Sequence, residues 1–140
     1  MCCARTLAPI TVLLLAAAPA SGASISHAKL WQNRSGSVVC GIKIHPQGKP
    51  ATELLCGSKG IPRAAHGVGD PFVQLAAHGR AQLVLISQAS FEGSGTPVTL
   101  GRGASWRSLG VTCTIGAKTV TCENNSKHGF TVGDGKYSSF

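Results

Sequence analysis

Alternation of apolar and polar residues is the clearest pattern in this chain, and it is strongest in "VTCTIGAKTVTC", residues 111–122. Successive side chains of a β-strand point to opposite faces of the sheet. A hairpin that turns at residues 116–119 therefore puts the threonines on one face and the apolar residues on the other. The apolar face would carry Val111, Cys113, Ile115, Val120 and Cys122. Because β-branched residues dominate both runs, the pattern predicts a β-hairpin.

Further strands are predicted before and after this hairpin. Residues 37–45 alternate, and residues 128–132, "HGFTV", form a short strand followed by a turn in "GDGK". Residues 71–87 predict two strands joined at residues 77–80. The second, residues 83–86, is continuously apolar, so it is the expected central strand. A helix that begins at Asp70 and Pro71 is the alternative for this segment, because Asp before Pro suits a helix start. The alternating strand at 37–45 would carry on one face Val38, Cys40, Ile42 and Ile44.

Three segments are predicted to be connections: "HPQGKP" at 45–50, "EGSGTP" at 92–97 and "GRGASWRSLG" at 101–110. Glycine and proline mark turns and loops, and the chain contains 18 glycines and 7 prolines. Many short alternating runs separated in this way are typical of an all-β fold, here a small antiparallel sandwich or barrel. The sequence shows no recognisable internal repeat and no second domain.

The first residues, "MCCARTLAPITVLLLAAAPASGAS", have the pattern of a secretory signal peptide: Arg5, an apolar run at 7–18, then Pro19 and small residues. The run is shorter than the roughly 20 residues of a membrane-spanning helix, so no transmembrane segment is predicted. Cleavage is expected after Ala20 or Ala23. Ala23 is favoured because that cut leaves Pro19 between the apolar run and the cleavage site. We therefore expect a leader at 1–23 and one secreted or extracytoplasmic domain at 24–140.

Four cysteines lie outside this leader, and export favours disulfides between them. In the predicted hairpin Cys113 faces Cys122 at a non-hydrogen-bonded pair, where a cross-strand disulfide fits. Cys40 then pairs with Cys56 by elimination. Spacings of sixteen and nine residues do not match the closely spaced pairs of zinc sites. No metal and no other cofactor are predicted.

The charge of the chain favours anionic partners. Thirteen Lys and Arg against five Asp and Glu give a net charge of +8, which falls to +7 when Arg5 leaves with the leader. A positive protein is attracted to anionic surfaces such as cell-wall polymers. The alternative is that the charge mainly provides solubility, because the basic residues are scattered along the chain without a run of three. No specific nucleic-acid partner is predicted.

Two places are candidates for a site. Trp106 lies between Arg102 and Arg107, where an aromatic ring could stack on a sugar or base while guanidinium groups hold an anion. The alternative is that Trp106 is a core residue and the arginines are solvated. His128 is a candidate general base because histidine titrates near neutral pH; the alternative is that it supports a turn beneath Phe130. No motif supplies a nucleophile, and "EGSGT" lacks the G-x-S-x-G spacing, so no catalytic residue is assigned.

Two stretches resemble a known family. "WQNRSGSVVC" resembles the opening S-G-N-I-x-C pattern, and "GVTCTIGAKTVTCENNSKHGF" the closing C-x-N-x-x-G-H-G-F pattern, of small secreted actinobacterial domains of unknown function. The chain departs from these patterns at Arg34, Ser37 and Lys127, where the family usually has Pro, Asn and Gly. The resemblance implies an exported, disulfide-stapled bacterial domain, and it implies no activity.

These observations together predict a non-enzymatic exported β-domain that associates with the cell envelope or with anionic extracellular polymers through a basic surface. The surface expected for this role contains Arg102, Trp106, Arg107 and His128. One alternative is a small secreted hydrolase that uses His128. Another is an inhibitor or interaction module whose partner is a second secreted protein. The sequence leaves the oligomeric state open.

Overall fold

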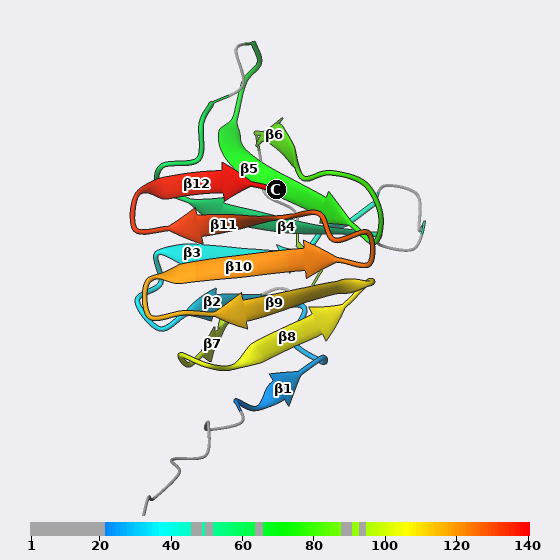
Figure 1. Ribbon diagram of the computed structural model, residues 1–140. Helices are drawn as coiled ribbons and strands as arrows, with labels where there is room; N and C mark the ends of the chain where they lie inside the picture. The colour runs from blue at the N-terminus through cyan, green and yellow to red at the C-terminus, as the bar shows by residue number, and fades with distance from the viewer. Residues whose placement is uncertain (1–21, 46–48, 50–51, 64–65, 88–90, 93–94) are drawn as a thin grey trace, which may run out of the picture.

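The computed structural model describes residues 22–45, 49, 52–63, 66–87, 91–92 and 95–140, and the strands within these residues form two six-stranded sheets (Figure 1). Sheet B consists, in spatial order, of β6 (Gln82–Ile86), β5 (Asp70–Ala76), β4 (Glu53–Ser58), β3 (Val38–Ile42), β2 (Leu30–Asn33) and β7 (Val98–Leu100). Sheet A consists of β1 (Ser24–Ile25), β8 (Ser105–Ser108), β9 (Val111–Ile115), β10 (Thr119–Asn124), β11 (Gly129–Gly133) and β12 (Lys136–Ser139).

The two sheets pack face to face as a β-sandwich. Figure 1 shows β9, β10 and β11 of sheet A lying over β2, β3 and β4 of sheet B, with the strands of the two sheets nearly aligned. Alternate side chains of each strand point into the space between them and form one apolar core. The largest of these fully buried side chains are Trp31, Trp106 and Phe130. The predicted all-β sandwich is therefore confirmed.

The sandwich contains an internal structural repeat, although the sequence shows no recognisable repeat. In sheet B, β2 pairs parallel with β7 and antiparallel with β3, and the sheet continues through β4, β5 and β6. In sheet A, β8 pairs parallel with β1 and antiparallel with β9, and the sheet continues through β10, β11 and β12. The strands β1 to β6 and β7 to β12 thus follow the same plan, and each half places its first strand in the sheet of the other.

Equivalent side chains occupy equivalent places in the two halves. Trp31, Cys40 and Cys56 are direct cross-strand neighbours in sheet B, as are Trp106, Cys113 and Cys122 in sheet A. The sequences of β3 and β9, "VVCGI" and "VTCTI", share the pattern V-x-C-x-I. The two tryptophan rings meet in the core with centroids 5.8 Å apart.

Both predicted disulfides are present. Cys40 bonds to Cys56 and Cys113 to Cys122, with Cα–Cα distances of 4.1 and 4.0 Å, and all four residues are fully buried. Short distances of this kind are expected at non-hydrogen-bonded pairs. Each bridge is expected to stabilise the fold by about 2–4 kcal/mol, mainly by restricting the unfolded chain. Because every cysteine of the described residues is used in this way, none is left as a zinc ligand.

The predicted hairpin at 111–122 is confirmed in register. Ile115 pairs with Val120 and Cys113 with Cys122. The amide of Gly116 donates to the carbonyl of Thr119 at 2.8 Å, and neither central turn residue, Ala117 or Lys118, has a positive φ. The turn is therefore not of the primed type that two-residue hairpins favour. The strands predicted around residues 71–87 and 128–132 are also present as β5, β6 and β11.

Several expectations at the element level are wrong. The helix alternative at Asp70 fails because Asp70 and Pro71 begin β5 and pair with β6. The apolar segment at 83–86 belongs to β6, which is an edge strand rather than the central one. Residues 105–108 of the expected connector form β8. Ile44 lies beyond the end of β3 and is 45% exposed, so it is outside the core.

Some expectations concern residues outside the described ranges. These are the leader up to residue 21, the centre of the turn at 45–50 and part of the loop at 92–97.

Candidate functional site

Trp106 lies inside the sandwich rather than on a binding surface. It points inward from β8, is 0% exposed, and packs against Trp31. Its indole N–H donates a hydrogen bond of 2.7 Å to the carbonyl of Ala28. A ring in this position cannot stack on a ligand, so the predicted binding surface loses its aromatic residue.

The remaining residues of that predicted surface are not gathered together. Arg102 is exposed in the loop between β7 and β8, a loop whose Gly103 amide donates to Ile115 at the end of β9. Arg107 is exposed on the outer face of sheet A, where its Nε donates to Thr112 Oγ1 at 3.2 Å. Thr112 lies near the start of β9 and Ile115 at its end. Because β8 runs beside β9, the two arginines lie toward opposite ends of β8. They do not form one basic site.

His128 belongs to a turn that Asn124 holds in place. The side-chain oxygen of Asn124 accepts from the amides of Ser126 and His128 at 3.0 and 3.1 Å. Its Nδ2 donates to the carbonyls of Ala76 and Gly79 at 2.9 and 2.7 Å. One buried amide thus joins the β10–β11 turn to the β5–β6 turn, and His128 contributes backbone groups to this arrangement.

The closing motif that resembles the secreted family therefore has a packing explanation. Gly129, which follows His128, lies so close to the Cys122 carbonyl that a Cβ would collide with it. Phe130 is fully buried beside Cys122 in the register of β10 and β11. Lys127, which replaces the family's glycine, has a φ of 64°, in the left-handed region that favours glycine. The motif builds a tight turn and a core contact.

A cleft at the opposite end of the sandwich is the best candidate for a site. Four segments meet there: the β2–β3 turn and the end of β4 from sheet B, and the β9–β10 and β11–β12 turns from sheet A. We call this the seam cleft, because it lies where the two sheets meet. Its volume is about 350 Å³, and its polar lining consists of Ser35, Ser37, Ser58, Lys59, Lys118 and Asp134.

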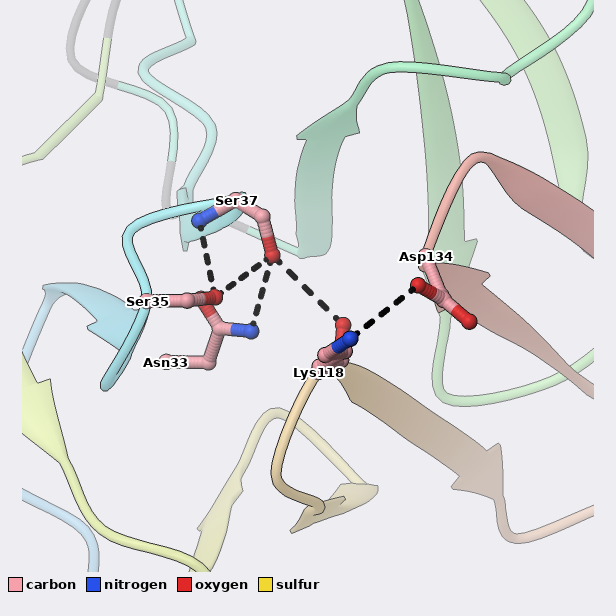
Figure 2. Close-up of polar contacts among 5 residues, drawn as sticks. All are labelled: Asn33, Ser35, Ser37, Lys118 and Asp134. Carbon is pink, nitrogen blue, oxygen red and sulfur yellow. Dashed lines mark hydrogen bonds and ion pairs between the residues drawn. The ribbon is translucent and has the colours of Figure 1, made fainter.

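The sheet B wall of the seam cleft is organised by Asn33, which is fully buried (Figure 2). Asn33 Oδ1 accepts from the amide of Val38 at 3.1 Å, which directs its Nδ2 to Ser37 Oγ, also at 3.1 Å. Ser37 Oγ in turn lies 2.8 Å from Ser35 Oγ and donates to the Lys118 carbonyl at 3.5 Å. This last contact joins the turns of the two sheets across the seam.

The sheet A wall carries opposite charges. Lys118 Nζ lies 3.9 Å from Asp134 Oδ1, and these side chains are 72% and 55% exposed (Figure 2). Asp134 and Gly135 have φ values of 52° and 70° between the paired residues Gly133 and Lys136, which defines a type I′ turn. Gly60, two residues beyond the end of β4, touches the Gly135 backbone so closely that a Cβ there would collide. This close approach holds the segment after β4 against the β11–β12 turn, beside the cleft.

A second polar cavity of about 200 Å³ lies on the outer side of sheet B, near the β5–β6 turn, and is lined by Glu53, Gln74, His78, Arg80 and Gln82. Two of its acceptors already have partners. Glu53 forms an ion-pair contact with His45, and Gln74 Oε1 accepts from Lys43 at 2.9 Å. Because His45 and Lys43 already occupy these two acceptors, and its volume is smaller, the cavity offers a ligand less than the seam cleft does.

Sequence reasoning did not identify the seam cleft. Its residues extend from Ser35 to Asp134 and come from four separate turns, so no local motif contains them. The available signals were the "GDGK" segment, which was predicted as a turn, and the "NRSGS" segment, which was interpreted as part of the family-like opening pattern.

The fold and this cleft define a class, a disulfide-stapled β-sandwich with a cleft lined by serine, lysine and aspartate residues where its sheets meet. No family model, no curated protein and no solved structure matches the chain. Within the described residues, no helix has the length and apolar character needed to cross a membrane, and no group of three His, Cys, Asp or Glu side chains is placed to hold a metal ion.

Proposed function

We propose that this protein is an exported, non-enzymatic domain that binds anionic extracellular polymers through the seam cleft. The observation that carries the proposal is the pair of lysines, Lys59 and Lys118, that line an open cleft together with serine hydroxyls. Ammonium groups beside hydroxyls offer charge and hydrogen bonds to phosphate or carboxylate groups. The net charge of +8 adds a general attraction to the same partners.

Export is supported by two independent features. The first residues have the composition of a secretory leader, and the fold contains two disulfides, which persist in oxidising compartments. A polymer partner is favoured because the cleft is open at the end of the sandwich, where a long chain can pass through it. The cell envelope supplies anionic polymers in that compartment.

A direct test measures binding of the purified domain to a polyglycerol phosphate polymer at increasing ionic strength. We expect binding at low salt that weakens steeply toward physiological salt, because exposed charges are screened over about 8 Å there. Salt-independent binding, or no binding at low salt, would contradict the proposal.

Two double variants with the same net charge distinguish binding at the cleft from a general attraction to the positive protein. Replacing Lys59 and Lys118 by Gln removes two cations from the cleft and is expected to weaken polymer binding about tenfold. The control replaces Lys29 and Lys127 by Gln. Both control lysines are exposed, pair with Glu92 and Glu123, and lie outside the lining of the cleft. Equal losses in the two variants would show that the cleft has no special role.

A further inference from the structure

We infer that the ligand of the seam cleft is a polyol phosphate, that is, a phosphate group attached to a short carbon chain that carries hydroxyl groups. This inference rests on the proposed function and gives it a chemical identity. It follows from counting which hydrogen-bond donors and acceptors of the cleft are already used and which remain for a ligand.

The hydroxyl hydrogens of Ser37 and Ser35 are already used. Ser37 Oγ accepts from Asn33 Nδ2, and its own hydrogen is directed to the carbonyl of Lys118. Ser35 must then be the donor in the 2.8 Å contact between the two serine oxygens. The Ser37 amide also points to Ser35 Oγ, at 3.4 Å. Since a hydroxyl has one hydrogen and two lone pairs, Ser35 keeps one lone pair for a ligand.

Ser58 and Asp134 add only acceptors. The hydroxyl of Ser58 donates to the Lys59 carbonyl at 3.2 Å, which leaves its lone pairs available. Asp134 is an exposed carboxylate whose ion-pair partner, Lys118, is at the long distance of 3.9 Å. An ionised carboxylate accepts hydrogen bonds and donates none.

The cleft therefore offers a ligand two kinds of group. The ammonium groups of Lys59 and Lys118 attract an anion, while Ser35, Ser58 and Asp134 require hydrogen-bond donors. A simple anion such as a phosphate monoester without hydroxyls satisfies the lysines and is repelled by Asp134. A neutral polyol satisfies the acceptors and leaves the lysines unused. A polyol phosphate satisfies both, and a cleft of about 350 Å³ lies at the small end of the usual range for ligand sites, about 300–1,000 Å³.

Titration with three small probes tests this ligand class, with binding followed by calorimetry or NMR at fixed ionic strength. The probes are glycerol phosphate, methyl phosphate, which has the same charged group without hydroxyls, and glycerol. We expect glycerol phosphate to bind about tenfold more tightly than methyl phosphate, the difference that one hydrogen bond to a charged group gives. Glycerol is expected to show no measurable binding. Equal affinities of the two phosphates would overturn the inference.

Asp134→Asn gives a test with opposite signs for the two phosphates. Asn tolerates the left-handed conformation at this position, and Asn-Gly is a favoured pair for a type I′ turn, so the fold should be kept. Loss of the negative charge is expected to strengthen methyl phosphate binding two- to threefold, while the glycerol phosphate advantage falls from about tenfold to below threefold. A variant that strengthens both ligands equally would show that Asp134 does not contact the hydroxyls.

Lys118→Gln, with Lys29→Gln as control, completes the set. Lys29 is 60% exposed and pairs with Glu92 at 3.3 Å, so it resembles Lys118 in setting but lies at the other end of β2. Loss of binding to both phosphates in Lys118→Gln, and no change in Lys29→Gln, is the expected result. Equal effects of the two substitutions would place the ligand outside the cleft.

The same headgroup occurs in soluble polymers and in lipids, so two further arms distinguish these sources. Polyglycerol phosphate in solution is compared with vesicles that contain phosphatidylglycerol. Binding of both supports recognition of the shared headgroup. If polymers bind with salt dependence and the variant without Lys59 and Lys118 loses binding, but the two phosphates bind equally and Asp134→Asn behaves as wild type, the proposed function stands and this inference fails. If no anionic polymer binds, the proposed function itself fails.

Discussion

Two buried asparagines, Asn33 and Asn124, organise opposite ends of the molecule. Asn33 is 0% exposed and fixes Ser37 and the amide of Val38 at the seam cleft. Asn124 is 3% exposed and uses all four hydrogen-bonding positions of its amide to join two turns at the other end. Buried polar groups are tolerated when they are satisfied in this way.

Asn124→Ala should destabilise the protein strongly because it leaves the carbonyls of Ala76 and Gly79 and two amides without partners. At about 1 kcal/mol for each hydrogen bond, we expect the free energy of unfolding to fall by about 2–4 kcal/mol. Asn125→Ala is the matched control, since the Asn125 side chain is exposed. The hydrogen bonds that Asn125 makes in the described structure are donated by its backbone N–H, which alanine keeps. Denaturant unfolding measures both. A loss below about 1 kcal/mol in Asn124→Ala would contradict the role assigned to it.

The two core tryptophans give a second comparison at the residue scale. Trp106 donates to Ala28, whereas the indole N–H of Trp31 is buried and has no partner within the described structure. Trp106→Phe loses a hydrogen bond and Trp31→Phe removes an unsatisfied donor, while both lose similar ring area. We therefore expect Trp106→Phe to reduce the free energy of unfolding by about 1–2 kcal/mol more than Trp31→Phe. Equal losses, or the reverse order, would argue against this difference.

At the element scale, the contacts next to strand β1 favour one of the two predicted cleavage sites of the leader. The Ser105 amide donates to the Ala23 carbonyl at 3.1 Å, and Gly22 packs closely against the Gly103 carbonyl. These contacts extend the parallel pairing of β1 with β8 beyond Ser24 toward the N-terminus. Cleavage after Ala23 would remove them, whereas cleavage after Ala20 would keep them.

If the protein is exported as proposed, we therefore expect cleavage after Ala20 and a mature protein that begins at Ser21, although the sequence pattern favours cleavage after Ala23. The intact mass or N-terminal sequence of the exported protein measures this directly. A form that begins at Ser24 should also be less stable than one that begins at Ser21 by about 0.5–1.5 kcal/mol, the value of one backbone hydrogen bond. A mature terminus at Ser24 with no loss of stability would contradict the importance of these contacts.

Half of the strands in the described residues, β3, β5, β6, β9, β10 and β11, could be predicted from the sequence because their apolar patterns are local. The hairpin at 111–122 was predicted in register since its turn and its cysteines lie within twelve residues. The prediction that residues 83–86 form the central strand was wrong, because β6 lies at the edge of its sheet. A continuously apolar run indicates burial on both faces of the sheet. Because β6 is an edge strand, its side chains are only partly covered, and Leu83 is 36% exposed.

The internal repeat escaped prediction for a different reason. The two halves share V-x-C-x-I in β3 and β9, but their cysteines are 16 and 9 residues apart. Longer connections in the first half remove any constant period from the sequence. The equivalence appears only when the strands are paired, because register depends on strand positions and not on loop length.

For the whole molecule, the two-sheet architecture creates the candidate site. Sheet B supplies Ser35, Ser58 and Lys59, and sheet A supplies Lys118 and Asp134, so neither sheet alone contains the cleft. The disulfides lie in the core within each sheet and hold β3 to β4 and β9 to β10, the strands whose ends carry Ser37, Ser58 and Lys118 near the cleft. No sequence motif could predict a site built from turns that only the sandwich brings together.

The central claim is that anionic polymers bind at the seam cleft, and an amide chemical-shift map of the labelled protein during titration with polyglycerol phosphate tests it most directly. The account predicts that the largest shifts fall on Ser35, Ser58, Lys59, Lys118 and Asp134, with small shifts at the Asn124 end. Largest shifts around Arg107 and His128, or uniform small shifts over the whole surface, would contradict it.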